Sequence, residues 1–366
     1  MRPTRLAAVI IILICAAYAG TGGTAPLVAG AARQTMQGPG PTRPAGEAGQ
    51  TTPQDNQQPA PTGPAQIPQS PETLKVQTSL VNVFATVRDK HNAIISDLKK
   101  EDFKIYEDGQ EQKVAYFGKE TDLPITLGMM MDTSGSMDRL LSSEQDAAVR
   151  FLKEVMRPKD EAMVMSFDLD VDLLADFTQD TSVLERAIRR TVINTAGGLG
   201  PVTPGTIPNN NVGGTLLYDA IYLACHDQLE TEAGRKALII MSDAEDEGSH
   251  LSLKDGIEAA QRADTVIHFL LMNDVGFFSG VGMGYDGASV AQKMTEETGG
   301  RVIDVHNEKT LEKAFDEISE ELRSQYVLGY YPTNTKRDGT FRKIKVEVER
   351  PDTKVLARKG YYAPVS

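Results

Sequence analysis

The middle of the chain repeats one pattern, in which a continuous hydrophobic run is followed by a segment with helical spacing. The runs cover residues 125–131, 237–241 and 265–271, and shorter ones lie at 162–167 and 301–305. Uninterrupted runs of this kind are typical of parallel strands that are buried on both faces. Helical spacing marks residues 141–155, 183–188, 216–229 and 311–322. Strands that alternate with helices predict an α/β fold, with a mostly parallel central sheet covered by helices.

The two ends of the folded region follow a different pattern, in which hydrophobic and polar residues alternate. Strands are expected at residues 80–87, 103–106 and 113–117, and again at 326–331, 344–348 and 354–358. The Asp108-Gly109 pair predicts a tight turn that joins 103–106 and 113–117 as a hairpin. Because each set of strands is too small to be stable alone, we expect the two sets to build one discontinuous β-sandwich.

The first residues have the pattern of an export signal. Arg2 and Arg5 precede a hydrophobic run over residues 6–18, and residues 17–19 read Ala-Tyr-Ala, which matches a small-residue cleavage pattern. The run is shorter than the roughly 20 residues that a membrane span needs. We therefore expect cleavage, with membrane contact only if the segment stays uncleaved. The protein is expected to be exported, to the periplasm, the cell envelope or the medium.

The segment after the signal has a composition of its own. Gly, Pro, Gln, Thr and Ala dominate it, and it contains too few large hydrophobic residues to offset the entropy lost on folding. We interpret it as a spacer. The predicted organisation is a signal peptide at 1–19, a disordered linker at 20–72, the N-terminal part of the β-sandwich at 73–122, the α/β domain at 123–323 and the C-terminal part of the sandwich at 324–366.

Composition narrows the classes of function. The formal net charge of the 366 residues is −13, which disfavours nucleic-acid binding because a phosphate backbone attracts a basic face. Tryptophan is absent, which argues against an aromatic platform for bases or sugars. After cleavage only Cys225 remains, so no intrachain disulfide can form, and we expect this thiol in the core. We also expect His268, inside a hydrophobic run, to be a core residue with satisfied hydrogen bonds.

Candidate metal ligands follow the first buried run. Asp132, Ser134 and Ser136 form a D-x-S-x-S pattern directly after it. Ligands of a parallel sheet bind beyond the carboxyl ends of its strands, which is where this loop would lie. Thr215 precedes a predicted helix and Asp243 follows the second hydrophobic run, so both should reach the same edge. All these donors are hard oxygens, which suits Mg²⁺ or Mn²⁺ and argues against zinc.

Three runs carry a family resemblance. ITLGMMMDTSGSM, GGTLLYDAI and KALIIMSDAEDEGS resemble the von Willebrand factor A (VWFA) domain with a metal-ion-dependent adhesion site, which is a Rossmann-like α/β domain. The family pattern is D-x-S-x-S, a distant threonine and a distant aspartate, and it falls here on Asp132, Ser134, Ser136, Thr215 and Asp243. The flanking β segments resemble those of the acidobacterial-type VWFA-related proteins, and the likeness extends over residues 78–364.

The resemblance implies a metal-dependent protein-binding function. Ser134 and Ser136 would bind the ion directly. Asp132 and Asp243 would bind the ion directly or through water. Thr215 would bind it directly in one conformation of the domain and through water in the other. The ion is expected to be Mg²⁺, with Mn²⁺ or Ca²⁺ as alternatives, and a partner protein would present a carboxylate to its open position. No catalytic residue, organic cofactor or small-molecule substrate is implied, so we expect the chain not to be an enzyme.

The resemblance also implies movement, because the last helix of related domains shifts when ligand binds. That helix is expected at residues 310–322 and leads directly into the strand that begins at Tyr326. This continuity offers a route for coupling between the metal site and the β-sandwich.

Two other functions remain open at this stage. One is a structural or assembly factor of the cell envelope, whose ion only fixes the loops. The other is a hydrolase in which the ion activates water, for which residues 243–247 alone offer a nearby base. A second acidic motif, Asp168-x-Asp170-x-Asp172, lacks the glycine of a calcium loop and is interpreted as a solvated loop. Segments 194–214 and 273–287 are long irregular stretches, which are usually functional or disordered. The first should lie beside the ion, where it would shape or cover the partner site, and the alternative for both is a mobile surface insertion.

Overall fold

The computed structural model describes residues 80–119, 123–193, 214–272 and 287–365, all within one unit that spans residues 73–366. The expected signal peptide and linker therefore lie outside the described residues, as do nearly all of segments 194–214 and 273–287. Within the described part, no helix is long and hydrophobic enough to cross a membrane.

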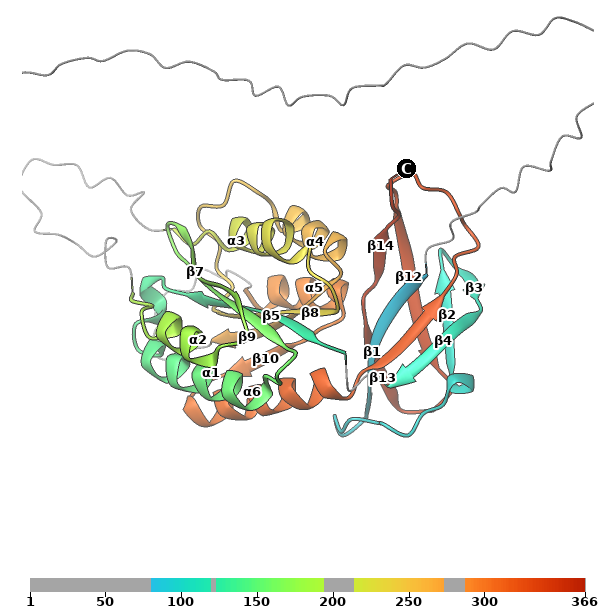
Figure 1. Cartoon of the computed structure of the whole chain (residues 1–366), viewed down its shortest axis with the longest axis horizontal. Helices are drawn as coiled ribbons and strands as arrows, with labels where there is room; N and C mark the ends of the chain where they lie inside the picture. Colours follow the sequence, from blue (N-terminus) through green and yellow to red (C-terminus); the bar gives the residue numbers. More distant parts are fainter. Residues whose placement is uncertain (1–79, 120–122, 194–213, 273–286, 366) are drawn as a thin grey trace, which may run out of the picture. The chain divides into compact units, whose positions relative to one another are not determined.

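A six-stranded sheet forms the centre of the α/β region, in the order β10-β9-β8-β5-β6-β7 (Figure 1). The strands are β5 (Ile125–Asp132), β6 (Glu161–Phe167), β7 (Val171–Thr178), β8 (Arg235–Ser242), β9 (Thr265–Met272) and β10 (Val302–Val305). All neighbours pair in parallel except β7, which runs antiparallel to β6. Every residue of β5 is buried. The mostly parallel sheet is thus confirmed, and β7 is an edge strand that the sequence pattern did not reveal.

Helices cover both faces of this sheet. On one face, α1 (Leu141–Val155), α2 (Thr181–Ile188) and α6 (Glu308–Arg323) share a hydrophobic core with Met129 and Met131 of β5. The elements that share the other core with Met130 are α3 (Leu217–Leu223), its π-helical continuation η4 (Ala224–Leu229), α4 (Leu253–Arg262) and α5 (Gly287–Thr298). Successive residues of β5 therefore point into opposite cores, as expected of a strand buried on both faces.

Cys225 and His268 were both predicted to be core residues, and the structure bears this out fully only for Cys225. Cys225 is fully buried in the second core, and burial raises the pKa of its thiol to about 12, which fits an inert core residue. His268 of β9 is also fully buried, but neither ring nitrogen has a hydrogen-bond partner within the described residues. The expectation of a satisfied histidine was therefore wrong, because the backbone groups around it serve the ladders of a central strand. Burial lowers the pKa of the His268 ring, and the nearby charged groups Glu321, Arg301 and Arg88 also act on it.

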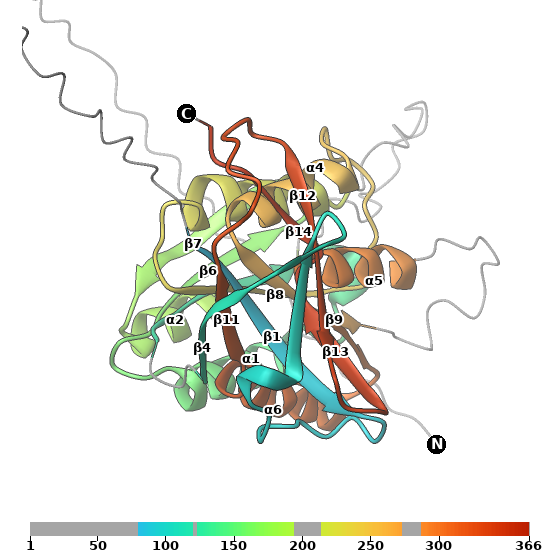
Figure 2. The same cartoon turned by 90° about the vertical axis from the view of Figure 1, so that its right-hand side faces the viewer.

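Two four-stranded antiparallel sheets form the β region, in the orders β13-β1-β11-β4 and β14-β12-β2-β3 (Figures 1 and 2). The N-terminal strands are β1 (Val81–Asp89), β2 (Phe103–Glu107), β3 (Gln110–Gln112) and β4 (Val114–Lys119). The C-terminal strands are β11 (Tyr326–Tyr330), β12 (Phe341–Val348), β13 (Thr353–Ala357) and β14 (Gly360–Tyr362). Each sheet combines strands from both ends of the chain, and the sheets share a core that includes Val83, Ile105 and Leu328.

The predicted hairpin has a different second strand. Asp108 (φ 49°) and Gly109 (φ 82°) form the tight turn, but it joins β2 to the short strand β3. The segment that was expected to complete the hairpin is β4, which pairs with β11 in the other sheet. The prediction was wrong because β11 is buried along its whole length and needs a partner on each side, which β1 and β4 provide.

A buried ionic group connects α6 with the β region. Glu321, near the end of α6, accepts hydrogen bonds from Arg88 of β1 at 2.7 Å and from Arg301 at 2.9 Å. The carboxylate of Glu321 is fully buried, and Arg88 is nearly so. Because only two residues separate the end of α6 from the start of β11, the same helix end is fixed to two strands of one sheet.

Candidate metal centre

Asp132 is held at the carboxyl edge of the central sheet by its neighbours. It ends β5, and the parallel pairing of β5 with β8 places it beside Ser242. Ser242 Oγ donates a hydrogen bond to Asp132 Oδ2 at 2.6 Å, and the backbone N–H of Ser134 donates to Asp132 Oδ1 at 2.8 Å. One carboxylate oxygen is therefore held by the following loop and the other by the end of the neighbouring strand β8.

The two serines of the D-x-S-x-S loop lie side by side. Ser134 precedes a short 3₁₀ turn, Gly135–Met137, and the backbone N–H of Met137 donates to the carbonyl of Ser134 at 3.1 Å. The Oγ atoms of Ser134 and Ser136 are 3.1 Å apart, so the two hydroxyls are hydrogen-bonded to each other. Neighbouring hydroxyls beside a carboxylate offer the kind of oxygen cluster that a small divalent cation binds.

Asp168 connects this loop with the loop that carries Thr215. Its carboxylate accepts a hydrogen bond from Thr133 Oγ1 at 2.5 Å, and its carbonyl accepts one from the backbone N–H of Leu216 at 2.8 Å. Thr215 itself is buried, and its carbonyl accepts from the backbone N–H of Glu247 at 3.1 Å. Asp170 and Asp172 are exposed, as expected of a solvated loop, but Asp168 departs from that expectation, since it is half-buried and bonded to two other loops.

The second predicted carboxylate, Asp243, follows β8 and is mostly buried. Its Oδ1 accepts a hydrogen bond from the backbone N–H of Glu245 at 3.1 Å. Burial raises the pKa of Asp132 to about 7, and the negative charge of Asp243 adds to this shift. Asp132 and Asp243 are thus close enough to repel each other, which a bound cation would relieve.

Glu144 is a further carboxylate that the sequence pattern did not single out. It lies in the first turn of α1, is fully buried, and neither of its carboxylate oxygens has a hydrogen-bond partner within the described residues. Burial raises its pKa well above the usual value, and the charges of Asp132 and Asp243 act in the same direction. Its helical spacing could have indicated that Glu144 is buried, because Leu141, Glu144 and Ala148 fall on the face of α1 that packs against the sheet.

The donor set fits a hard divalent cation. It consists of two carboxylates and three hydroxyls, with no histidine or cysteine. Among the described residues no group of three or more His, Cys, Asp or Glu side chains could hold an ion alone, so the hydroxyls would have to complete the site. Buried carboxylates that lack a counter-charge are costly, so the orphaned oxygens of Glu144 and the repulsion between Asp132 and Asp243 favour a cation here. Ser134, Ser136 and Thr215 would supply neutral oxygens, which Mg²⁺ accepts together with water.

The raised pKa of Asp132 predicts how pH affects the metal-free protein. A group whose pKa is 3.8 when free and about 7 in the fold stabilises the fold fully at low pH and loses that contribution as the pH rises through 7. With chelator present, we therefore expect the melting temperature to fall by several degrees between pH of about 5 and about 8. Asp132→Asn should reduce this slope. An identical slope in the wild type and in Asp132→Asn would contradict the assignment.

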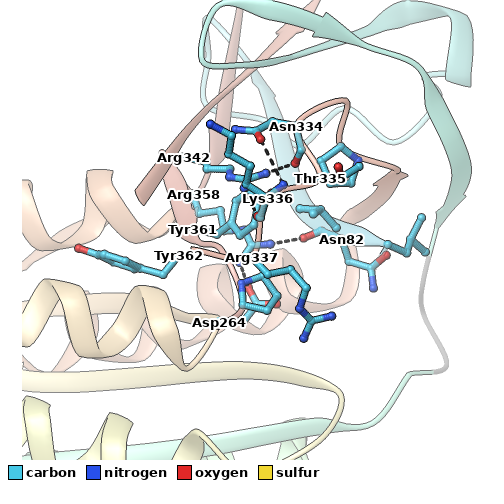
Figure 3. Close-up of a pocket in the computed structure, with 14 residues that line it drawn as sticks. Asn82, Asp264, Asn334, Thr335, Lys336, Arg337, Arg342, Arg358, Tyr361 and Tyr362 are labelled. Atoms are coloured by element: carbon cyan, nitrogen blue, oxygen red, sulfur yellow. Dashed lines mark hydrogen bonds and ion pairs between the residues drawn. The ribbon is translucent and has the colours of Figure 1, made fainter. Parts of the chain in front are cut away.

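A separate hollow lies among residues of the β region and Asp264 (Figure 3). Its volume is about 210 Å³, and its lining includes the cationic side chains of Lys336, Arg342 and Arg358. Arg342 donates to the backbone carbonyls of Asn334 and Lys336, and Arg358 donates to Asp264 Oδ1 at 2.6 Å. Cationic side chains do not bind metal cations, so this hollow is not a second metal centre.

The sheet order and the hydroxyl and carboxylate cluster at its carboxyl edge define the class of protein: an α/β domain of the von Willebrand factor A type, with additional antiparallel sheets. Residues 127–245 match the family model described as the von Willebrand factor type A domain, and this part of the chain has the fold of such a domain. Domains of this family are general metal-dependent adhesion and protein-interaction modules. No curated protein matches the sequence.

Solved structures of low sequence identity are similar to the chain. One is the conserved hypothetical protein BatB from Bacteroides thetaiotaomicron, with 17% identity, a TM-score of 0.39, and coverage of 55% of this chain and 100% of that chain. Another is the vWF domain of the type V pili tip protein Mfa5 from Porphyromonas gingivalis, with 16% identity, a TM-score of 0.39, and coverage of 55% and 95%. A third is proximal thread matrix protein 1 from the mussel byssus with a zinc-occupied MIDAS motif, with 12% identity, a TM-score of 0.44, and coverage of 59% and 49%. The chain spans about half the length of this third protein.

Proposed function

We propose that this chain is an exported, metal-dependent protein-binding module. Asp132, Ser134, Ser136, Thr215 and Asp243 would hold a divalent cation, Mg²⁺ in the first place and Mn²⁺ or Ca²⁺ as alternatives. The ion would bind a carboxylate of a partner protein at its open coordination position. The observation that carries the proposal is the buried Asp132 carboxylate, which is fixed on both oxygens beside paired serine hydroxyls and repelled by Asp243.

Charge explains why an acidic protein would bind an acidic group. Without a cation, Asp132 and Asp243 would repel a partner carboxylate, and burial would strengthen the repulsion. A divalent cation offsets two negative charges and prefers oxygen donors of full charge over water. Because Ser134, Ser136 and Thr215 are neutral ligands, they leave the ion attractive to an external carboxylate. Partner binding is therefore expected to require both the ion and the intact hydroxyl set.

The location and the domain limits belong to the same proposal. Residues 1–19 would direct export and 20–72 would hold the folded part away from a surface, in the periplasm, the cell envelope or the medium. Residues 73–122 and 324–366 would form the β-sandwich around the α/β domain at 123–323. Membrane contact would follow only from an uncleaved signal segment.

A capture experiment tests partner binding. The mature chain is immobilised and exposed to envelope extract with Mg²⁺ or with chelator, beside the double variant Ser134→Ala/Ser136→Ala. We expect chelator and the double variant each to lower capture at least about tenfold, because both remove the ion that contacts the partner. Ser142→Ala, an exposed serine on α1, is the matched control and should capture normally. Capture that survives both treatments would contradict the proposal and favour the structural or assembly alternative.

A further inference from the structure

Glu144 occupies a position where a carboxylate is unfavourable. It faces the sheet from the first turn of α1, between Leu141 and Ala148, which both belong to the hydrophobic core on that side. The residue is fully buried, and its backbone N–H completes the helix by donating to the carbonyl of Leu140. The side chain makes no hydrogen bond with the described residues. A core position with this surrounding would normally hold a hydrophobic residue.

The groups around Glu144 make a negative charge on its carboxyl group unfavourable unless a ligand lies beside it. A buried polar group that lacks a partner costs free energy, and a buried charge costs more. The groups that act on Glu144 electrostatically are Asp132 and then Asp243, and both are negative. Glu144 lies in the first turn of the helix that follows the D-x-S-x-S loop, and it is near enough to Asp132 and Asp243 for their charges to act on it. The three side chains do not by themselves form a metal-binding group. Such an arrangement is stable only where protons neutralise the carboxyls or a cation lies among them, and a bound cation would keep all three charged.

We propose that Glu144 is a third carboxylate of the metal centre and acts on the ion through a bound water. This inference rests on the proposed function, since it presupposes the cation. Mg²⁺ keeps several waters when proteins bind it, and each water needs an acceptor for its hydrogens. The free oxygens of Glu144 provide that acceptor, in the way that groups in the outer layer orient the ligands of other metal sites.

The role has a consequence for ion selection. A third carboxylate increases the negative charge around the ion, which favours a small, strongly hydrated divalent cation such as Mg²⁺ over a monovalent one. A single substitution of Glu144 should also affect ion binding and the stability of the metal-free fold in different ways. Removal of the Glu144 charge should weaken ion binding, while the metal-free fold should be unharmed or stabilised, because an unpartnered buried carboxylate is lost.

The test uses Glu144→Gln, which keeps the shape of the side chain, with Glu154→Gln as the matched control. Glu154 lies on the same helix but is exposed. Mg²⁺ affinity is measured by calorimetry on the chelator-treated chain, and the melting temperature is measured without metal. We expect Glu144→Gln to lower the affinity about 10- to 100-fold and to leave the metal-free melting temperature equal or higher. Glu154→Gln should change neither quantity.

The outcomes separate the two proposals. An unchanged affinity in Glu144→Gln, with Asp132→Ala still abolishing binding, would overturn the role of Glu144 alone. An absence of Mg²⁺ binding by the wild type would overturn the proposed function and this inference together. If Glu144→Gln does not fold, Glu144→Met is measured in its place, since it keeps the volume without a polar atom. Failure of both variants to fold would also overturn the inference, because the carboxylate would then be needed without the ion.

Discussion

Replacing Asp132 by alanine should abolish the rise in melting temperature that Mg²⁺ gives to the wild-type chain. A ligand that binds only the folded state stabilises it by about 3 kcal/mol when its concentration is about 100 times Kd. For a folded region of this size, the melting temperature should then rise by roughly 5–10 °C. Asp132 carries the central carboxylate of the site, so the variant should show no rise at the same Mg²⁺ concentration.

The comparison needs a control for general charge effects. Asp170 is an exposed aspartate in the loop that follows β6, so Asp170→Ala changes the net charge equally. It should keep the full response to Mg²⁺. An equal response in Asp132→Ala and the wild type would show that the stabilising ion binds elsewhere on this acidic protein.

Replacing Glu321 by alanine should destabilise the protein more than any other single change in the charged groups described above. Its carboxylate is the shared acceptor for Arg88 and Arg301, and it is fully buried. The loss of one partner from a buried ionic group costs about 3–5 kcal/mol, because the remaining charges stay buried without compensation. We expect the melting temperature to fall by roughly 10 °C, measured by thermal or denaturant unfolding.

Glu317 provides the matched control for this prediction. It also pairs with Arg301, at 2.7 Å, but it is a quarter exposed and lies one turn earlier on α6. Glu317→Ala should therefore cost about 1 kcal/mol or less. If Glu321→Ala were no more destabilising than Glu317→Ala, the buried group could not be what fastens the end of α6 to β1.

The parts of the fold that could be predicted are those with a local cause. The strand β5 is buried on both faces, and its uninterrupted hydrophobic run shows this without any knowledge of its neighbours. The D-x-S-x-S loop could be predicted as a candidate site because it lies at the carboxyl end of such a strand, where ligands of parallel sheets bind. Asp132, Ser134 and Ser136 are brought together by contacts over two residues, which the sequence spacing itself specifies.

The parts that could not be predicted depend on contacts between distant residues. Asp168 is bonded to Thr133 across 35 positions, and nothing near Asp168 in the sequence signals it. Strand β4 does not complete the predicted hairpin with β2. It pairs instead with β11, which lies more than 200 residues later and needs a second neighbour beside β1. Glu144 has helical spacing with core residues, but spacing alone does not distinguish a buried carboxylate from one at the margin of a hydrophobic face.

The most direct test of the metal centre is a calorimetric titration of Mg²⁺ into the chelator-treated chain, with Asp132→Ala and Asp170→Ala beside it. We expect one saturable site in the wild type and in Asp170→Ala, and no saturable binding in Asp132→Ala. Saturable binding that persists in Asp132→Ala, or its absence from the wild type, would contradict a metal centre at the carboxyl edge of the central sheet.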